Sequence, residues 1–453
     1  MEQQNKLKNK EFLKIAVPAV LEGLVTVIIT TIDTRMISVL GKPAISAVSF
    51  TVQPKLIFFS FFFALGTALS FFVAQAYGKK DEKEANYYFH TILKITIILA
   101  ILLGILLMIF ARPVMMLCNR QPDTLDMSVS FFRIIMGFMI FQALSIVLNA
   151  ALRGIGKTKV TFFSNIAMGV TDIIFNYLLI EGHLGFPRLE VKGDAIATVM
   201  GTAAACTVSL IVIFTQSGFL KLKGFFKGRI FSNRELLGNI VSKAGNIVFE
   251  NLFMRIGFLI SSIIVSRLST DETAVYAVAM LLLNYSFACA DGIQSAVVAL
   301  TGRSYGAKDY SSFGQYSGIA VKYGLLTSFM LTIIYISTAK LYFGGFFQDQ
   351  ASIRVGFISA IIVSGLTFMQ IIRVAETAMM RGMGEVKDPR RIATVCVAIV
   401  NPGLSYLLAI KGSFGIWGIW LASAITQGLW MVASIILSRI HRKRLKNKST
   451  ETA

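Results

Sequence analysis

The stretch Tyr77-Gly78-Lys79-Lys80-Asp81 returns, nearly unchanged, as Tyr305-Gly306-Ala307-Lys308-Asp309, 228 residues later. Such a repeat over about half of the 453 residues predicts a duplicated chain with two similar lobes. Three further echoes have the same separation: Arg153-Gly154-Ile155-Gly156 with Arg381-Gly382-Met383-Gly384, Glu22 with Glu250, and Ile37-Ser38-Val39-Leu40 with Val265-Ser266-Arg267-Leu268.

Composition assigns the chain to membrane proteins. Hydrophobic residues make up 55% of it and charged residues only 15%, whereas soluble proteins carry about a quarter charged residues. A bilayer core needs roughly 20 apolar residues per helix. The sequence therefore predicts an all-α integral membrane protein with twelve transmembrane helices, six in each lobe. The predicted spans are 12–40, 48–76, 88–111, 128–152, 159–181, 194–216, 238–268, 274–301, 315–342, 354–380, 391–411 and 415–438.

Positive charge alternates between the predicted loops, which indicates orientation, because cytoplasmic loops are enriched in Lys and Arg. The rich set comprises Lys6, Lys8, Lys10, Lys14, Lys79, Lys80, Lys83, Arg153, Lys157, Lys159, Lys221, Lys223, Lys227, Arg229, Arg303, Lys308, Lys387, Arg390, Arg391 and the tail Arg439 to Lys448. The sparse set comprises Lys42, Arg112, Arg120, Arg188, Lys192 and Lys411. We expect both termini in the cytoplasm and the protein in the plasma membrane.

An even number of spans per lobe makes the repeats parallel, related by a pseudo-two-fold axis along the membrane normal. The predicted organisation is an N-lobe at 1–215, a cytoplasmic linker at 216–237, a C-lobe at 238–440 and a basic tail at 441–453. The net charge of +20 is mostly this topology signal, and its dispersal among loops argues against nucleic acid as a partner.

Asp33 is the most informative single residue, because a carboxylate within a span is expensive and is functional by default. An ion pair with Arg35 near the outer interface is the competing interpretation. In the fifth span Asp172 and Asn176 are four residues apart and share one helix face. Thr198 lies at a similar depth in the sixth span, which opens with Gly193-Asp194.

Asp33, Asp172, Asn176 and Thr198 could therefore meet in the outer half of the first lobe and bind Na⁺ or relay protons. Hydrogen bonding between neighbouring helices is the alternative for the two residues of the fifth span.

A second set of candidates could line a substrate or coupling cavity: Glu22, Glu250, Asn251, Asp291 and Arg255. Glu22 is eleven residues before Asp33 on the same helix face, and Glu250 is its duplicate, although both could simply close helix contacts. Asp291-Gly292 is a candidate break in the eighth span, while Arg373 and Glu376 are expected to form an intrahelical pair.

Chemistry on bound substrates is not expected. Arg153-Gly154-Ile155-Gly156-Lys157-Thr158 lacks the Gly-x-x-x-x-Gly-Lys spacing of a phosphate loop, and the three histidines are scattered. The four cysteines have no paired spacing, so neither a disulfide nor a metal framework is predicted. We expect no enzyme and no cofactor beyond a coupling ion.

The chain resembles the multidrug and toxic compound extrusion (MATE) transporters over essentially its full length. The matching pieces are Pro18, Ile32-Asp33-Thr34, Val39-Leu40-Gly41, Ala44, Ala47-Val48, Val73-Ala74-Gln75-Ala76-Tyr77-Gly78, Arg153-Gly154, Leu178-Leu179-Ile180, Gly185-Phe186-Pro187, Ala195-Ile196-Ala197-Thr198, Glu250-Asn251 and Arg381-Gly382. Each piece is short, and their order, spacing and duplication make the match specific.

The resemblance implies an antiporter of two six-helix lobes that rock between inward-open and outward-open states. It implies a first-lobe Na⁺ or H⁺ site at the positions of Asp33, Asp172, Asn176 and Thr198. Here the order of acid and amide on the fifth span is the reverse of the family's. Some family members use second-lobe acids instead, for which Glu250 is a candidate.

The sequence thus predicts a monomeric, cation-coupled exporter of lipophilic, cationic small molecules, drugs or metabolites. A lipid-linked oligosaccharide flippase of the same superfamily is the alternative, disfavoured because only Arg255 and Arg133 could hold a pyrophosphate. A channel or a non-transporting scaffold would be a different class, and ion flux without a counter-substrate would reveal a channel.

Overall fold

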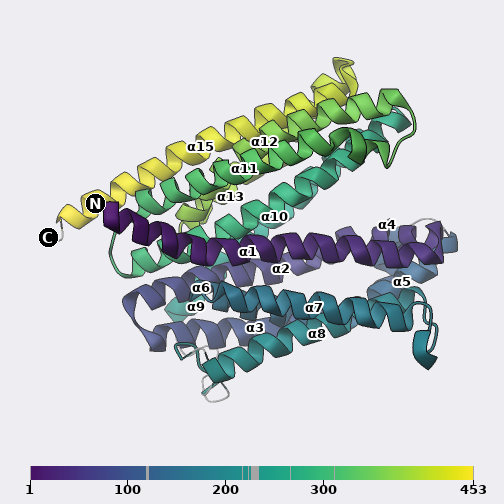
Figure 1. Ribbon diagram of the computed structural model, residues 1–453. Helices are drawn as coiled ribbons and strands as arrows, with labels where there is room; N and C mark the ends of the chain where they lie inside the picture. Colours follow the sequence, from purple (N-terminus) through teal and green to yellow (C-terminus); the bar gives the residue numbers. More distant parts are fainter. Residues whose placement is uncertain are drawn as a thin grey trace. The chain divides into compact units, whose positions relative to one another are not determined.

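The computed structural model describes residues 2–118, 122–216, 218–222, 224–225, 234–265, 267–310 and 312–451, and all regular elements in these ranges are helices (Figure 1). Arg120, Ser266 and residues 217, 223 and 226–233 of the predicted linker at 216–237 lie outside the described residues.

Two consecutive groups of helices follow the chain. The first comprises α1 (Glu2–Ile37), α2 (Lys42–Lys79), α3 (Glu82–Ile109), α4 (Ala111–Cys118), α5 (Pro122–Gly137), α6 (Met139–Gly154), α7 (Thr158–Leu179) and α8 (Val191–Gln216). The second comprises α9 (Arg234–Val265), α10 (Thr270–Gly306), α11 (Ser312–Gly344), α12 (Gln350–Gly382), α13 (Lys387–Ala393), α14 (Asn401–Ser405) and α15 (Gly415–Glu451). Two π-helical segments, Thr394–Val400 and Tyr406–Lys411, flank α14.

Eleven helices in the described ranges are long and apolar enough to cross a membrane, and one bent pair completes twelve spans. That pair is Thr124–Gly137 with Met139–Gly154, bent by 50°. The predicted fourth span is therefore broken rather than straight. The break follows Gly137, where a Cβ would overlap Cε of Met108, so α3 packs closely against the bend.

Contacts divide the chain into two compact units. The N-terminal unit is Leu24–Val248, and the C-terminal unit combines Met1–Gly23 with Phe249–Ala453. Both divisions fall inside helices, α1 and α9, rather than in the linker. The lobe boundaries expected from the sequence stay a prediction.

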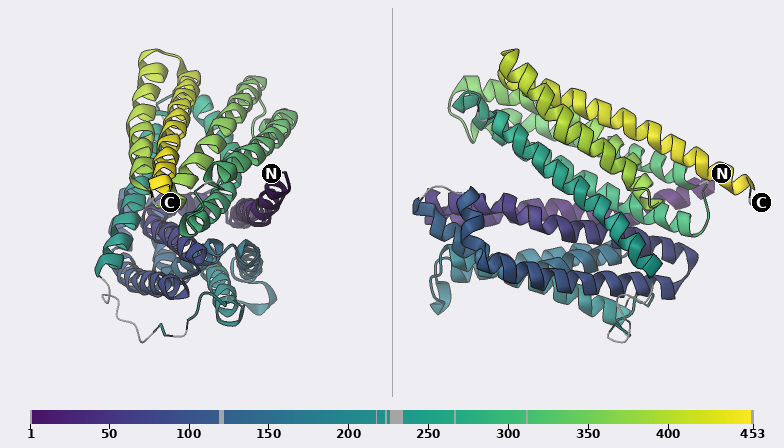
Figure 2. Two further views of the ribbon diagram at one scale, coloured as in Figure 1. Left: turned by 90° about the vertical axis from the view of Figure 1, so that its left-hand side faces the viewer. Right: turned by 180° about the vertical axis from the view of Figure 1, so that it is seen from behind.

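The two units repeat the same helix pairings. In the N-terminal unit α2 packs against α3 and α6, and in the C-terminal unit α10 packs against α11 and α12 (Figure 2). Both Tyr-Gly-x-Lys-Asp stretches end a helix in the same way. Lys80 and Lys308 each have φ of 59°, and Asp81 and Asp309 donate their N–H to the carbonyl five residues earlier, at 3.0 and 2.9 Å.

The repeated Arg-Gly stretches also have one structural role. A Cβ on Gly154 would lie 3.2 Å from Cβ of Val73, and one on Gly382 would lie 2.9 Å from Cβ of Thr301. Val73 and Thr301 are themselves 228 residues apart. Each glycine thus allows two long helices of its unit to approach closely. The duplication predicted from the sequence extends to packing contacts.

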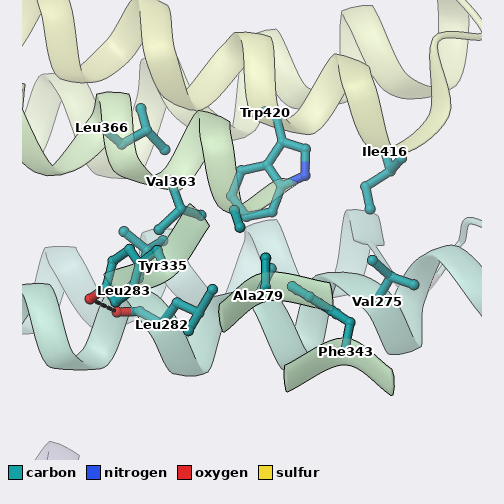
Figure 3. Close-up of a cluster of buried hydrophobic side chains, with 12 residues drawn as sticks. Val275, Ala279, Leu282, Leu283, Tyr335, Phe343, Val363, Leu366, Ile416 and Trp420 are labelled. Carbon is teal, nitrogen blue, oxygen red and sulfur yellow. Dashed lines mark hydrogen bonds between the residues drawn. The ribbon is translucent and has the colours of Figure 1, made fainter. Parts of the chain in front are cut away.

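Aromatic and aliphatic side chains form the interior of the C-terminal unit. Trp420 of α15 is 1% exposed, and its ring N–H donates to Oγ of Ser359 at 3.1 Å. Nearby, the hydroxyl of Tyr335 donates to the carbonyl of Leu282 at 2.7 Å (Figure 3). Large rings are tolerated in this interior because their polar tips have partners.

The eighth span is continuous, so the break considered at Asp291-Gly292 is wrong. α10 runs without interruption from Thr270 to Gly306. A Cβ on Gly292 would lie 2.5 Å from the backbone nitrogen of Val20 on α1. Gly292 therefore allows α10 to approach α1 closely, and the α-helix continues through it.

Candidate functional site

Three helices of the N-terminal unit bring together the residues predicted to bind the coupling ion. The side-chain amide of Asn176 on α7 donates to Oδ1 of Asp33 on α1 at 2.6 Å. Asp172, one turn earlier on α7, lies within electrostatic range of Asp33 and next to the hydroxyl of Thr198 on α8. The predicted grouping of these four residues agrees with their positions, and their role stays a prediction.

Small residues set the approach of the helices that carry this group. A Cβ on Gly201 of α8 would lie 2.8 Å from the carbonyl of Met168 and 3.1 Å from Cβ of Asp172. α8 therefore passes directly against α7 at the level of the acid. Asp172 is only 6% exposed and Asn176 is fully buried, which places a carboxylate and an amide in a water-poor interior.

Two charged residues that the sequence analysis left without a role join this group. Asp194 of α8 is fully buried, and its carboxylate lies within hydrogen-bonding reach of the Asp33 carboxylate, with no N–H or hydroxyl donor to either oxygen among the described residues. Lys55 of α2 lies within electrostatic range of Asp194, Asp33 and Asp172, in that order of strength. We name these six residues, Lys55, Asp33, Asp172, Asn176, Asp194 and Thr198, the charged cluster.

Signals for both additions are present in the sequence. Lys55 is the first charged residue in the predicted second span, 48–76, and an intramembrane lysine is a functional hypothesis by default. Asp194 is four residues before Thr198 and so shares its helix face. Neither position lies in one of the four echoes of the duplication.

The C-terminal unit carries an uncharged counterpart of this cluster. Ser261 is 228 residues after Asp33, and Asn401 is 229 after Asp172. Gly193-x-x-x-Ala197-Thr198 is matched by Gly418-x-x-x-Ala422-Ser423 in α15. Asn401 joins the counterparts through hydrogen bonds from Ser261 at 3.1 Å and to Ser423 at 3.5 Å.

The C-terminal unit carries apolar side chains at the positions that match the other two charged residues of the cluster, Lys55 and Asp194. Lys55 corresponds to Leu283, and Asp194 corresponds to Ile419. Leu283 is 8% and Ile419 1% exposed, so both are ordinary interior residues. The duplicated fold therefore forms without charge at these positions.

The second set of predicted residues lies in the C-terminal unit, where Glu250 is already paired. Its Oε1 lies 2.5 Å from the guanidinium of Arg381, which also donates to Gln294 at 2.8 Å. Glu250 is 2% exposed, and it and the exposed Asp291 both act electrostatically on the buried Arg373. Glu22 is also buried, at 9% exposure.

The remaining members of that set stand apart from this pair. Asn251 and Arg255 are half-buried on α9, and the described hydrogen bonds of the Glu250–Arg381 pair do not include them. A shared cavity for the whole set stays a prediction.

The expected intrahelical pair of Arg373 and Glu376 is wrong. The guanidinium of Arg373 stacks on the ring of Trp430, 3.7 Å from its centroid. Glu376 instead accepts hydrogen bonds from Ser317 at 2.9 Å and Ser438 at 2.5 Å. Glu376 is therefore hydrogen-bonded to side chains of two neighbouring helices, α11 and α15, and not to Arg373 of its own helix.

No group of three or more His, Cys, Asp or Glu side chains in the described part of the chain has the geometry of a metal site. The charged cluster combines carboxylate, amide and hydroxyl oxygens with the amino group of Lys55.

Comparison with known proteins agrees with the duplicated fold. The MatE family model matches residues 18–178 and again 247–407, two matches that begin 229 residues apart. The chain is 25% identical over 388 residues to "Probable multidrug resistance protein YoeA" of Bacillus subtilis, covering 84% of this chain and 82% of the relative. It is 25% identical to "Probable multidrug resistance protein NorM" of Listeria monocytogenes, covering 97% and 95%.

Solved structures share the fold at lower identity. A crystal structure of MATE in complex with MaL6 superposes with a TM-score of 0.89 at 17% identity, covering 97% of each chain. An outward-facing MATE family transporter of the MOP superfamily has a TM-score of 0.89 at 16% identity, also over 97% of each chain. With both halves matched by the family model, this chain belongs to the MatE family and is a multi-pass membrane transporter.

Proposed function

We propose that this protein is a cation-coupled antiporter that exports lipophilic, cationic small molecules across the plasma membrane by alternating access. The observation that supports a coupling site most directly is the contrast between the two units. Asp33, Asp172 and Asp194 lie together in one unit, while the matched positions in the other are Ser261, Asn401 and Ile419.

The contrast between the two units supports a role for the carboxylates in function and not in folding. Because the C-terminal unit forms the same helix pairings with uncharged side chains, the carboxylates are not needed to build the fold. Buried acids in a span are costly, and they are retained where an ion or proton is handled. The acids are therefore best explained by a reversible partner of positive charge.

Coupling follows if the cation and the cargo prefer different states of the protein. A cation that enters from outside would neutralise Asp33 and Asp172 and alter packing between α1, α7 and α8. That change would favour release of the cargo outward. Na⁺ and H⁺ both fit this scheme, because carboxylate oxygens can bind either one.

The class of cargo is inferred from composition. The chain contains 36 Phe and 18 Met residues, and methionine side chains repack around ligands of different shape. Acidic groups inside an otherwise apolar protein favour positively charged lipophilic compounds. The relatives named as probable multidrug resistance proteins support the same class.

Orientation is part of the proposal, with both termini in the cytoplasm. Within the C-terminal unit, Glu11 of α1 accepts from Arg303 at 3.3 Å and from Tyr316 at 3.0 Å, close to the turn between α10 and α11. Near the end of α15, His441 lies 2.8 Å from Asp388 at the start of α13. Both chain ends thus lie beside turns of the basic, predicted cytoplasmic set.

Beyond Arg255 and Arg133, the candidates from the sequence, the buried arginines Arg381 and Arg373 give a lipid-linked oligosaccharide flippase no further support. Arg381 is neutralised by Glu250, and Arg373 stacks on Trp430. Neither guanidinium is available as the open pyrophosphate clamp that such a flippase would need.

The test is uptake of a fluorescent lipophilic cation into proteoliposomes, with a sodium gradient and a pH gradient imposed one at a time. We expect wild-type uptake under one of the two gradients, and we expect Asp33→Asn to lose at least about 90% of it, because the acid is the group that α7 holds through Asn176. Asp126→Asn, at an exposed acid paired with Arg112, is the matched control and should transport normally. Full, gradient-dependent transport by Asp33→Asn would exclude the site from the mechanism.

A further inference from the structure

Lys55 places an amino group among carboxylates that an external cation would have to neutralise. It acts electrostatically on Asp194, Asp33 and Asp172. No described carboxylate oxygen lies within 4.0 Å of its Nζ, so the ammonium is a neighbour of the acids rather than a direct ion-pair partner. Three carboxylates against one ammonium leave a formal excess of negative charge in the cluster.

Asp194 supplies an independent sign that the cluster receives a ligand. It is fully buried, and its carboxylate lies within hydrogen-bonding reach of the Asp33 carboxylate, with no N–H or hydroxyl donor to either oxygen among the described residues. Two buried carboxylates that meet in this way are costly unless an ion, a proton or water satisfies them. The electrostatic neighbours of this carboxylate are Asp33, Asp172 and Lys55.

The duplicated unit shows that the fold itself does not need the lysine. Its counterpart Leu283 is 8% exposed and belongs to the interior cluster around Trp420 (Figure 3). A buried leucine in a span has no charge to desolvate, whereas a buried lysine there must be stabilised by nearby acids. Lys55 and the three acids therefore form one group of charges in the N-terminal unit, and the matched positions of the C-terminal unit carry no charge.

We propose that the ammonium of Lys55 is a tethered counter-ion that competes with the coupling cation for Asp33, Asp172 and Asp194. The inference rests on the proposed coupling function and deepens it, because it states what limits the affinity of the site for the cation. A site of three bare carboxylates would hold a cation too tightly to release it in each transport cycle. The lysine lowers that affinity by repulsion and offsets part of the negative charge of the acids when the external cation has left.

The experiment measures binding of Na⁺ to the purified full-length protein in detergent, by radioactive sodium binding and by the sodium-dependent rise in Tm. Lys55→Leu introduces the residue that the other unit carries, and Lys55→Gln is a second variant of different shape. We expect both to bind Na⁺ at least about tenfold more tightly than the wild type and to show a larger sodium-dependent rise in Tm. Lys55→Arg keeps the charge and should bind as the wild type does.

Charge compensation provides the second arm. Lys55→Leu combined with Asp194→Asn removes one charge of each sign, and its Na⁺ affinity should return to within about threefold of the wild type. Lys94→Gln is the matched control, because Lys94 lies on α3 over the ring of Phe225 and not among the charges that act on the acids. It should leave Na⁺ binding unchanged.

Unchanged Na⁺ affinity in folded Lys55→Leu and Lys55→Gln would overturn the inference, as would equal tightening by Lys94→Gln. The outcome is separable from the proposed function. Gradient-driven uptake by the wild type with no effect of Lys55 on Na⁺ binding contradicts only the tethered counter-ion. Tighter Na⁺ binding by Lys55→Leu in a protein that transports nothing under either gradient contradicts only the antiport.

Discussion

Asn176 faces Asp33 across α1 and α7, while Asp172, one turn away, faces Thr198 on α8. A carboxylate can only accept hydrogen bonds, whereas an amide also donates two. With the amide in the nearer position, the two carboxylates of α1 and α7 do not meet directly. The reversed order of acid and amide on α7 thus still produces a donor for Asp33 and a separate hydroxyl neighbour for Asp172.

At the same scale, the buried pair of Glu250 and Arg381 gives a stability prediction. The two side chains are 2% and 11% exposed, so removing one leaves an unpaired charge in the interior. We expect Arg381→Met to lower the free energy of unfolding by about 3–5 kcal/mol. The check is thermal unfolding in detergent.

The double variant Glu250→Gln with Arg381→Met serves as the control for that prediction. It removes both charges, so it should lose clearly less stability than Arg381→Met alone. If the single and double variants unfold at the same temperature, the pair does not carry the electrostatic cost assigned to it.

At the scale of helices, the close approach at Gly382 predicts intolerance of any side chain. A Cβ there would overlap Oγ1 of Thr301 and lie 3.1 Å from the backbone nitrogen of Gly302, so α12 would have to move away from α10. We expect Gly382→Val to lower stability by several kcal/mol, as severe overpacking does, and to reduce the yield of folded protein. Size-exclusion profiles and Tm in detergent measure this.

Another glycine of α12 provides the comparison. A Cβ on Gly365 would have no atom within 4 Å, so Gly365→Ala should raise stability by about 0.5–1 kcal/mol. A loss of stability in Gly365→Ala as large as that in Gly382→Val would contradict the packing argument for Gly382.

The start of α10 carries a second prediction at this scale. Ser269 accepts the N–H of Glu272 at 3.3 Å, and Glu272 also accepts the N–H of Ile416 at 3.0 Å, which ties α15 to α10. Ser269→Ala should cost about 1 kcal/mol, because it removes only the cap. Glu272→Ala should cost more, since it removes the hydrogen bond from the Ser269 N–H to the Glu272 carboxylate and the tie to Ile416 together. A smaller loss of Tm for Glu272→Ala than for Ser269→Ala would contradict this order.

At the scale of the whole molecule, orientation can be read from a native thiol. Cys118 is exposed at the end of α4, in a loop predicted to face outward, while Cys206, Cys289 and Cys396 are buried. In intact cells a membrane-impermeant maleimide should therefore label the wild type, and Cys118→Ser should abolish that labelling. Labelling only after the cells are opened would place this loop in the cytoplasm and reverse the proposed topology.

The same thiol predicts a dependence on pH. Partial burial raises the pKa of Cys118 above that of a free cysteine. Because the thiolate is the reactive form, its fraction at neutral pH is smaller than for a fully hydrated thiol. The labelling rate should accordingly be low near pH 7 and should keep rising beyond the pH at which a free cysteine levels off. A rate that levels off earlier would show that the thiol is not desolvated.

Much of this molecule follows from local properties of the sequence. Apolar block length predicts the spans, and the echo of Tyr77-Gly78 at Tyr305-Gly306 predicts the duplication. Asp33 stands out because any carboxylate in such a block is costly, whatever surrounds it. These properties depend on composition and spacing along one helix, so they need no knowledge of neighbours.

Tertiary packing decided which side chains meet. The sequence places Lys55, Asp172 and Asp194 on three different helices, and only the approach of those helices inside the N-terminal unit puts them within electrostatic range. Packing likewise gave Glu376 two serines as partners in place of Arg373. The physical reason is that a buried charge takes the best partner available in three dimensions, and helix crossings, set by close contacts such as those at Gly201 and Gly382, determine which partners those are.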